Sequence, residues 1–142
     1  MNLRLPAKKL RIVDIVNGKY VEGNGIEKRP SYVITPLGIK ASRVNIFGVV
    51  VDTFLNEDKT YGSLILNDGT EAIRVKLFRE KTKFMEKLSP GDKVLVIGKI
   101  RNFNGEIYVN GEVVRKVEEE GFEKYRKLEL EKIEKKYKKI VE

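Results

Sequence analysis

The sequence contains no cysteine and no histidine. Without cysteine the chain has neither disulfides nor thiolate metal sites, which is typical of an intracellular protein. Without histidine it lacks the commonest general base and the commonest metal ligand, so enzymatic activity and a bound metal or cofactor are disfavoured. No apolar run reaches the roughly 18 residues that a membrane helix needs. The first six residues lack the apolar segment of a secretory signal. We therefore expect a cytoplasmic protein with no membrane partner.

Positive charge is in excess and is unevenly distributed. The 142 residues include 29 lysines and arginines against 21 aspartates and glutamates, for a formal net charge of +8. Residues 118–142 hold 8 basic and 8 acidic residues, so the whole excess lies in residues 1–117. A basic body with a neutral tail indicates a polyanionic partner for the body and another role for the tail. The alternative is a basic surface that serves only solubility.

The chain divides into three parts by composition. Residues 1–42 contain three of the four prolines and four glycines. This predicts an irregular arm, with one short strand or helical turn, that wraps the rest of the molecule. Two apolar stretches of the arm, Leu10–Val16 and Tyr32–Ile34, are expected to dock on the core. Residues 43–117 form a strand-rich body and residues 118–142 a helical tail. Abundant lysine and glutamate also resemble the composition of thermophilic proteins.

The body shows the alternation of apolar and polar residues that predicts β-strands. An Asp68-Gly69 turn closes a hairpin between the second strand and the third. A second hairpin is expected around residues 102–105. The predicted strands are Arg43–Leu55, Tyr61–Asn67, Glu71–Phe78, Lys93–Arg101 and Glu106–Val117, with a short helix over Glu80–Leu88 between the third and the fourth.

Three strands, one short helix and two strands follow the order of the OB-fold, a five-stranded Greek-key barrel. Gly48 lies inside the long first strand, where we expect it to permit a bulge or a bend that lets one strand serve both sides of the barrel. We therefore predict a mainly β protein with an OB-fold barrel over residues 43–117, an N-terminal wrapping arm and a C-terminal helix. An SH3-like barrel is the alternative, and the helix between strands 3 and 4 favours the OB-fold.

The tail predicts a helix over residues 119–142, because it lacks proline and its apolar residues recur every three or four positions. A helix of about 20 residues extends about 30 Å, which is more than a small barrel needs to cover its own base. Such a stripe often packs against a partner helix, although folding back onto the barrel is the alternative. The residues assigned to the partner interface are Phe122, Tyr125, Leu130, Ile133, Tyr137 and Ile140.

Two strands repeat a pattern of two basic residues and one aromatic residue at alternate positions. Because the intervening residues are apolar, both sets are expected to point away from the core. Lys59 and Tyr61, near the first loop, are expected to extend the same surface. The two sets are Arg74, Lys76 and Phe78 on the third strand, and Lys99, Arg101 and Phe103 on the fourth strand and its hairpin.

Basic and aromatic side chains on one exposed face suit unpaired nucleic acid. Cations meet the backbone phosphates and release condensed counterions, and an exposed ring stacks on a base with little sequence preference. A duplex hides the faces of its bases, so the pattern favours a single strand. The alternative is an ordinary solvated strand face, with Phe78 capping one end of the barrel core.

In these residues the chain resembles the middle-sized subunit of archaeal replication protein A. The matching passages are Ser42–Val50, Leu66–Thr70 and Gly98–Phe103. The resemblance implies single-stranded DNA binding in replication, repair and recombination, with base stacking by Phe78, where relatives commonly have tryptophan, and by Phe103. It also implies a C-terminal helix that joins those of two other subunits in a heterotrimer. Many relatives continue with a winged-helix domain after this helix.

The leading hypothesis from the sequence is a non-enzymatic single-stranded DNA-binding subunit of a replication protein A-like complex. One alternative is an OB subunit that holds a complex together and has little DNA affinity of its own. Another is an RNA- or tRNA-binding OB module, because an OB barrel by itself does not specify its ligand.

Overall fold

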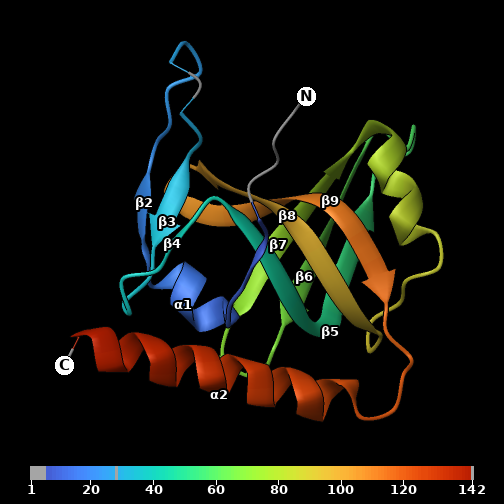
Figure 1. The fold of residues 1–142 in the computed structure, drawn as a ribbon. Helices are drawn as coiled ribbons and strands as arrows, with labels where there is room; N and C mark the ends of the chain where they lie inside the picture. The colour runs from blue at the N-terminus through green and yellow to red at the C-terminus, as the bar shows by residue number, and fades with distance from the viewer. Residues whose placement is uncertain (1–5, 28, 142) are drawn as a thin grey trace.

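The computed structural model describes residues 6–27 and 29–141. It shows a barrel with a long helix lying along one side (Figure 1). In chain order the elements are β1 (Lys8–Lys9), α1 (Ile12–Val16), β2 (Lys19–Val21), β3 (Tyr32–Ile34), β4 (Lys40–Ala41), β5 (Arg43–Leu55), β6 (Tyr61–Asn67), β7 (Ala72–Phe78), the 3-10 helix η1 (Arg79–Met85), β8 (Lys93–Phe103), β9 (Glu106–Lys116) and α2 (Phe122–Val141).

Strands β5 to β9 close into a five-stranded barrel. Neighbouring strands follow the order β5-β6-β7-β9-β8, and β8 pairs back with β5. The pairing of β7 with β9 is parallel, whereas the other four pairings of the barrel are antiparallel. With η1 between the third and fourth strands of the barrel, this is the OB-fold order. The fold class expected from the sequence is therefore confirmed.

The pleat of each strand turns one set of side chains into the barrel. In β7, Ile73, Val75 and Leu77 are buried, whereas the residues at positions 74, 76 and 78 face outward. The same alternation in β8 buries Val96 and Ile100. The apolar residues of all five strands thus form one core, and the charged residues of β7 and β8 are left on the outside.

Strand β5 serves both sides of the barrel, as the sequence predicts, but Gly48 acts for a different reason. Residues 43–49 pair with β8 and residues 49–55 pair with β6. The irregularity in the ladder lies between Val50 and Asp52 and not at Gly48. A Cβ atom at Gly48 would lie 2.7 Å from the carbonyl oxygen of Asn67. Glycine is required there because the backbone of β6 approaches too closely for any side chain.

Gly48→Ala is expected to lower the free energy of unfolding by about 1–3 kcal/mol, because the added methyl group overlaps backbone atoms that cannot move without disturbing the β5–β6 pairing. Urea unfolding measures the loss. Gly25→Ala is the matched control, since a Cβ atom at Gly25 meets nothing within 4 Å. An equal loss in both variants would show that the close approach at Gly48 is unimportant.

The arm holds more regular structure than the sequence predicts. Strands β2, β3 and β4 form a small antiparallel sheet, and β1 pairs in parallel with β5. In Figure 1 the β2–β3 hairpin projects beyond the barrel. Ile12 and Ile15 of α1 are fully buried, so the stretch expected to dock on the core does so. These elements are two to five residues long, which is too short for hydrophobic periodicity to reveal.

Helix α2 folds back on its own chain, with its first half beneath the barrel and its second half beneath α1 and the arm (Figure 1). The ring of Phe122 lies 5.1 Å from that of Phe47, and Ile133 and Tyr137 pack against the core. Folding back was the alternative to a partner helix, and the structure adopts it. No helix within the described residues has the length and apolar character needed to cross a membrane.

The remaining residues of the predicted partner interface lie in different surroundings. Tyr125 is 62% exposed. Leu130 is half-buried and lines a groove between α2 and the barrel. The side chain of Ile140 falls outside the described residues. The predicted stripe is thus divided between the barrel and the solvent, and an interface with other subunits stays a prediction.

Candidate functional site

Lys76, on the outward face of β7, links this strand to the β8–β9 hairpin. Its ammonium nitrogen lies 5.0 Å from the ring centroid of Phe103 and 4.0 Å from that of Tyr108. In the sheet register Lys76 stands opposite Asn110 of β9. A cation over the faces of two rings is attracted by their quadrupoles. These contacts hold the tip of the hairpin beside β7.

A row of three further rings crosses the ends of β5, β6 and β7. The ring centroids of Phe54 and Tyr61 are 6.1 Å apart, and those of Tyr61 and Phe78 are 5.3 Å apart. Tyr61 stands directly opposite Phe78 in the sheet register. Distances of 4.5–7 Å are typical of aromatic contacts. The three rings therefore support one another as a continuous apolar strip.

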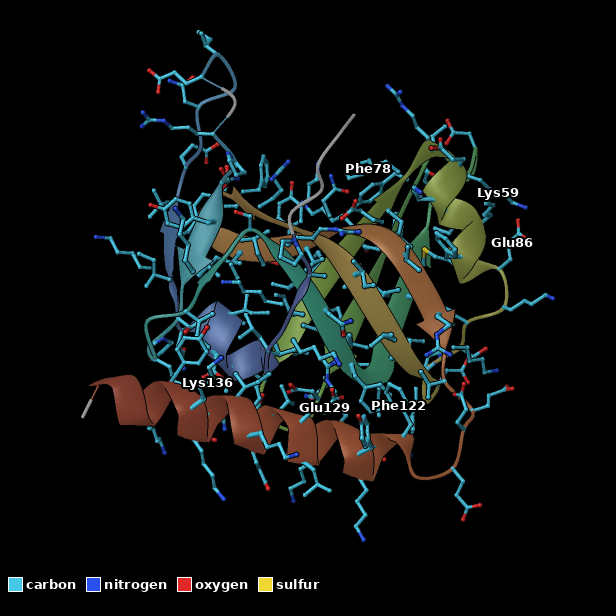
Figure 2. All side chains as sticks on the ribbon, viewed as in Figure 1. Lys59, Phe78, Glu86, Phe122, Glu129 and Lys136 are labelled. Carbon is cyan, nitrogen blue, oxygen red and sulfur yellow. The ribbon has the colours of Figure 1, made fainter. Side chains whose placement is uncertain are left out.

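The two phenyl rings singled out in the sequence are both open to solvent. Phe78 is 41% exposed and Phe103 is 62% exposed. Phe78 shares the outward face of β7 with Lys76, and Lys76 touches Phe103. The two rings therefore lie on one side of the barrel. Figure 2 shows Phe78 on the side away from α2, on which Phe122 is labelled. Contact of these rings with nucleic acid stays a prediction.

The other cations predicted for the site lie around this side of the barrel and differ in their exposure and in their partners. Arg74 forms an ion pair with Glu106, with Nε and Oε1 3.3 Å apart. Lys99 is exposed, whereas Arg101 is half-buried and donates a hydrogen bond to the Ile100 carbonyl at 2.9 Å. In the register Lys99 faces Asn110 and Arg101 faces Tyr108, which places both beside the Lys76 contacts.

Lys59 lies in the β5–β6 loop, two residues before Tyr61, and is exposed. Its carbonyl oxygen accepts a hydrogen bond from the Thr82 hydroxyl at 2.8 Å, which ties the loop to η1. In the same loop the hydroxyl and the amide of Thr60 donate to Asp58 and lower the pKa of this carboxyl group. The loop thus carries one fixed anion beside Lys59 at this end of the surface.

Sequence reasoning missed two rings of this surface, Phe54 and Tyr108. Phe54 is 55% exposed, but the irregularity after Val50 reverses the alternation of β5. Counting positions from the buried residues Val44 and Ile46 therefore assigns Phe54 to the core. Tyr108 could have been found, because it precedes the buried Val109 in a regular alternation.

The described residues offer no group of three or more acidic side chains placed to hold a metal ion. The exposed rings of the surface can stack on flat apolar ligands, and its cations attract anions. We refer to Phe54, Tyr61, Lys76, Phe78, Phe103 and Tyr108 as the aromatic face.

A family model described as the OB-fold nucleic acid binding domain matches residues 44–131. The match covers the whole barrel and the first half of α2. The chain belongs to this family. All six residues of the aromatic face lie within the matched segment, so nucleic-acid binding is the general function associated with this part of the chain.

A curated relative and two solved structures resemble the chain. The uncharacterized protein MJ1654 of Methanocaldococcus jannaschii is 36% identical over 98 residues, which are 69% of this chain and 39% of that protein. The chain therefore spans well under half the length of this relative.

The two structures are similar over almost the whole chain. One is a chain of the S. pombe Stn1–Ten1 complex, with a TM-score of 0.78, 18% identity and 96% coverage of both chains. The other belongs to a replication protein A heterotrimer bound to single-stranded DNA, with a TM-score of 0.74, 16% identity and coverage of 94% of this chain and 98% of that one. At such identities the likeness shows a shared fold, including the C-terminal helix.

Proposed function

We propose that the chain is a non-enzymatic single-stranded DNA-binding subunit of a replication protein A-like complex, acting in DNA replication, repair and recombination. The observation that carries the proposal is the exposure of Phe78 and Phe103 on one side of an OB barrel, with Lys76 beside them. Exposed phenyl rings cost free energy in water, and stacking on a base removes them from it. The likeness to a replication protein A subunit supports the same ligand.

In this proposal the rings of the aromatic face bind bases, and the lysines on and around this face bind phosphates. Unpaired bases stack on the rings of Phe78 and Phe103, each contributing about 1–3 kcal/mol with little sequence preference. Lys76, Lys99 and Lys59 meet the phosphates. Arg74 can also turn to a phosphate, because its ion pair with Glu106 is exposed and such pairs contribute only about 0–1 kcal/mol.

Removing cations from this surface is expected to weaken the salt dependence of binding. Lys76→Gln and Lys99→Gln should each reduce the slope of log K against log salt by roughly 0.7, the value for one phosphate contact on a single strand. Titrations of a short labelled single-stranded oligonucleotide at several salt concentrations measure this slope. Lys87→Gln, an exposed lysine after η1, is the control and should leave the slope unchanged. Equal slopes in all variants would remove Lys76 and Lys99 from the site.

The choice between DNA and RNA follows from competition between matched oligomers. The proposal expects the DNA oligomer to displace a labelled DNA strand at lower concentration than the RNA oligomer of the same sequence. Preference for RNA would instead support an RNA-binding OB module. A single-strand affinity weaker than about 100 μM, on the scale of charge alone, would support a subunit that serves assembly.

Assembly is the second candidate function, and a groove between α2 and the barrel favours it. The groove has a volume of about 1130 Å³ and is lined by Phe47, Val49, Val51 and Leu130, among others. Val51 is an exposed apolar residue. We infer that a partner subunit contributes an apolar segment here, in a complex that the C-terminal helix joins. Leu130→Glu is expected to abolish co-purification of other subunits with the chain from its native cells, and unchanged co-purification would contradict it.

A further inference from the structure

Most acidic side chains of helix α2 pair with the barrel and the arm, whereas several of its lysines face the solvent, although residues 118–142 are neutral overall. Three of its glutamates form ion pairs with cations outside the helix. Glu123 pairs with Lys93 at 2.7 Å, Glu129 with Lys9 at 2.5 Å, and Glu134 with Arg11 at 3.8 Å. Figure 2 shows Glu129 on the side of α2 toward the barrel. These contacts neutralise the acidic side chains of the helix on its inner side.

The outer side of α2 is left with cations. Lys124, Lys132 and Lys135 are exposed, and none of the three is ion-paired to a carboxylate within the described residues. They share one side of the helix with Tyr125 and Leu128, which are 62% and 50% exposed, because these positions recur every three or four residues. We call these five residues the lysine face.

Figure 2 shows that most of the long side chains projecting from the side of α2 away from the barrel are tipped with nitrogen, with oxygen-tipped side chains among them. The remaining exposed acid of the described helix, Glu131, borders this face, four residues before Lys135, and it lines the same groove as Lys124. With Glu131 counted, the lysine face and its border carry three positive charges against one negative charge.

We propose that the lysine face binds the phosphate backbone of a nucleic-acid duplex, as a second binding surface separate from the aromatic face. Lysine is a compact point charge without the fixed geometry of arginine, which suits contacts to phosphates without base recognition. A duplex presents one charge per about 1.7 Å of axis, twice the density of one strand. With one exposed ring and no groove for bases, the lysine face gains more from charge density than from stacking.

A protein partner fits the lysine face less well. Interfaces between proteins have an apolar core and are depleted of lysine, whereas this face offers Tyr125 and Leu128 among three lysines. The lysines span about 17 Å along the helix, at 1.5 Å per residue, which is enough to meet several phosphates of a duplex. Phe78 of the aromatic face lies on the side of the barrel away from α2 (Figure 2), so a duplex and a single strand can be bound together.

The test uses the full chain with two probes, a short blunt DNA duplex and a short single-stranded oligonucleotide. The triple variant Lys124→Glu, Lys132→Glu, Lys135→Glu is expected to bind the duplex about tenfold or more weakly at about 0.1 M salt, and its salt slope should fall by roughly 0.9 per lost contact. Its binding of the single strand should be unchanged. Unchanged duplex binding would overturn the proposal, as would a wild-type chain that does not bind the duplex at low salt.

Three further variants distinguish the loss of the lysine face from a loss of net charge, from the effect of added acid and from a loss of the aromatic face. Lys19→Glu, Lys83→Glu, Lys87→Glu removes the same charge from exposed lysines outside α2 and is expected to retain duplex binding. An equal loss there would show that net charge alone is responsible and would overturn the site. The triple glutamine variant of the lysine face, which adds no acid, should show a smaller loss in the same direction. A chain carrying Phe78→Ala and Phe103→Ala should lose single-strand binding and keep duplex binding, so the two proposals fail separately.

Discussion

Replacing both Phe78 and Phe103 with alanine is expected to weaken the binding of a short single-stranded oligonucleotide by about 2–6 kcal/mol. Each ring that stacks on a base contributes about 1–3 kcal/mol, and the two rings come from different strands. The corresponding loss of affinity lies between about 30-fold and more than 10⁴-fold. Either substitution alone should show about half of the effect. Titration of a labelled oligonucleotide by fluorescence anisotropy measures it.

The folded state of this variant should be preserved, because both side chains are exposed and contribute little to the core. Substitutions at such positions usually change the free energy of unfolding by less than about 0.5 kcal/mol. Tyr125→Ala is a matched control, since Tyr125 and Phe103 share an exposed fraction of 62% but Tyr125 lies on α2 and Phe103 at the end of β8. Tyr125→Ala should bind the oligonucleotide normally. A folded double variant with normal affinity would eliminate the aromatic face as the binding site.

Arg126→Ala is expected to lower the free energy of unfolding by about 2–4 kcal/mol, because the guanidinium is a buried anchor between α2 and the barrel. Arg126 is only 4% exposed. Its Nη1 donates to Oδ1 of Asn45 at 2.8 Å, and its Nη2 donates to the Asn45 carbonyl. Burial lowers the pKa of Arg126, an effect opposed by the charges of Glu129 and Asp68. Removing the side chain takes this donor from Oδ1 of Asn45 under the helix, whereas the Asn45 carbonyl keeps the Leu10 amide as a donor at 3.4 Å.

Urea unfolding of Arg126→Ala should show a lower midpoint than wild type. Lys127→Ala is the control, because this neighbouring residue is exposed and alanine favours a helix at least as well as lysine. Its stability should stay within about 0.5 kcal/mol of wild type. If both variants unfold like the wild type, α2 is not held on the barrel by Arg126, and a helix available to partner subunits becomes the better description.

The barrel could be predicted from the sequence because each of its strands carries a strong local signal. Alternating apolar residues in β7 and the Asp68-Gly69 turn fix both the pairing and the inner face there. The arm could not be predicted in detail, since β1 to β4 are two or three residues long and form through pairing with distant strands. The position of η1 was predicted, but its 3-10 geometry was not.

The aromatic face was only partly predictable, for a physical reason that concerns register. Alternation holds along β7 and β8, so the outward direction of Lys76, Phe78 and Lys99 follows from the sequence. In β5 the irregularity between Val50 and Asp52 reverses the alternation. Alternation read from the sequence therefore assigns Phe54 to the core, although its ring is exposed. No sequence pattern predicts such an irregularity, because it arises from the geometry of closing the barrel.

The charge of α2 shows how a neutral composition can conceal a polarised surface. The sequence gives equal numbers of acids and bases after residue 117, and their helical positions alone do not say which side meets the barrel. Ile133 and Tyr137 pack that side against the core, and Lys9, Arg11 and Lys93, which lie far away in the chain, pair with three glutamates of α2. Only the folded chain reveals that its lysine face is outward.

The central claim is that Phe78 and Phe103 stack on unpaired bases. NMR of the chain labelled at phenylalanine, titrated with a short single-stranded oligonucleotide, tests it most directly. We predict upfield shifts of the ring signals of Phe78 and Phe103. The signals of Phe47 of β5 and Phe122 of α2, whose rings pack against each other, should change little. Saturated binding that leaves the signals of Phe78 and Phe103 unmoved would contradict the account.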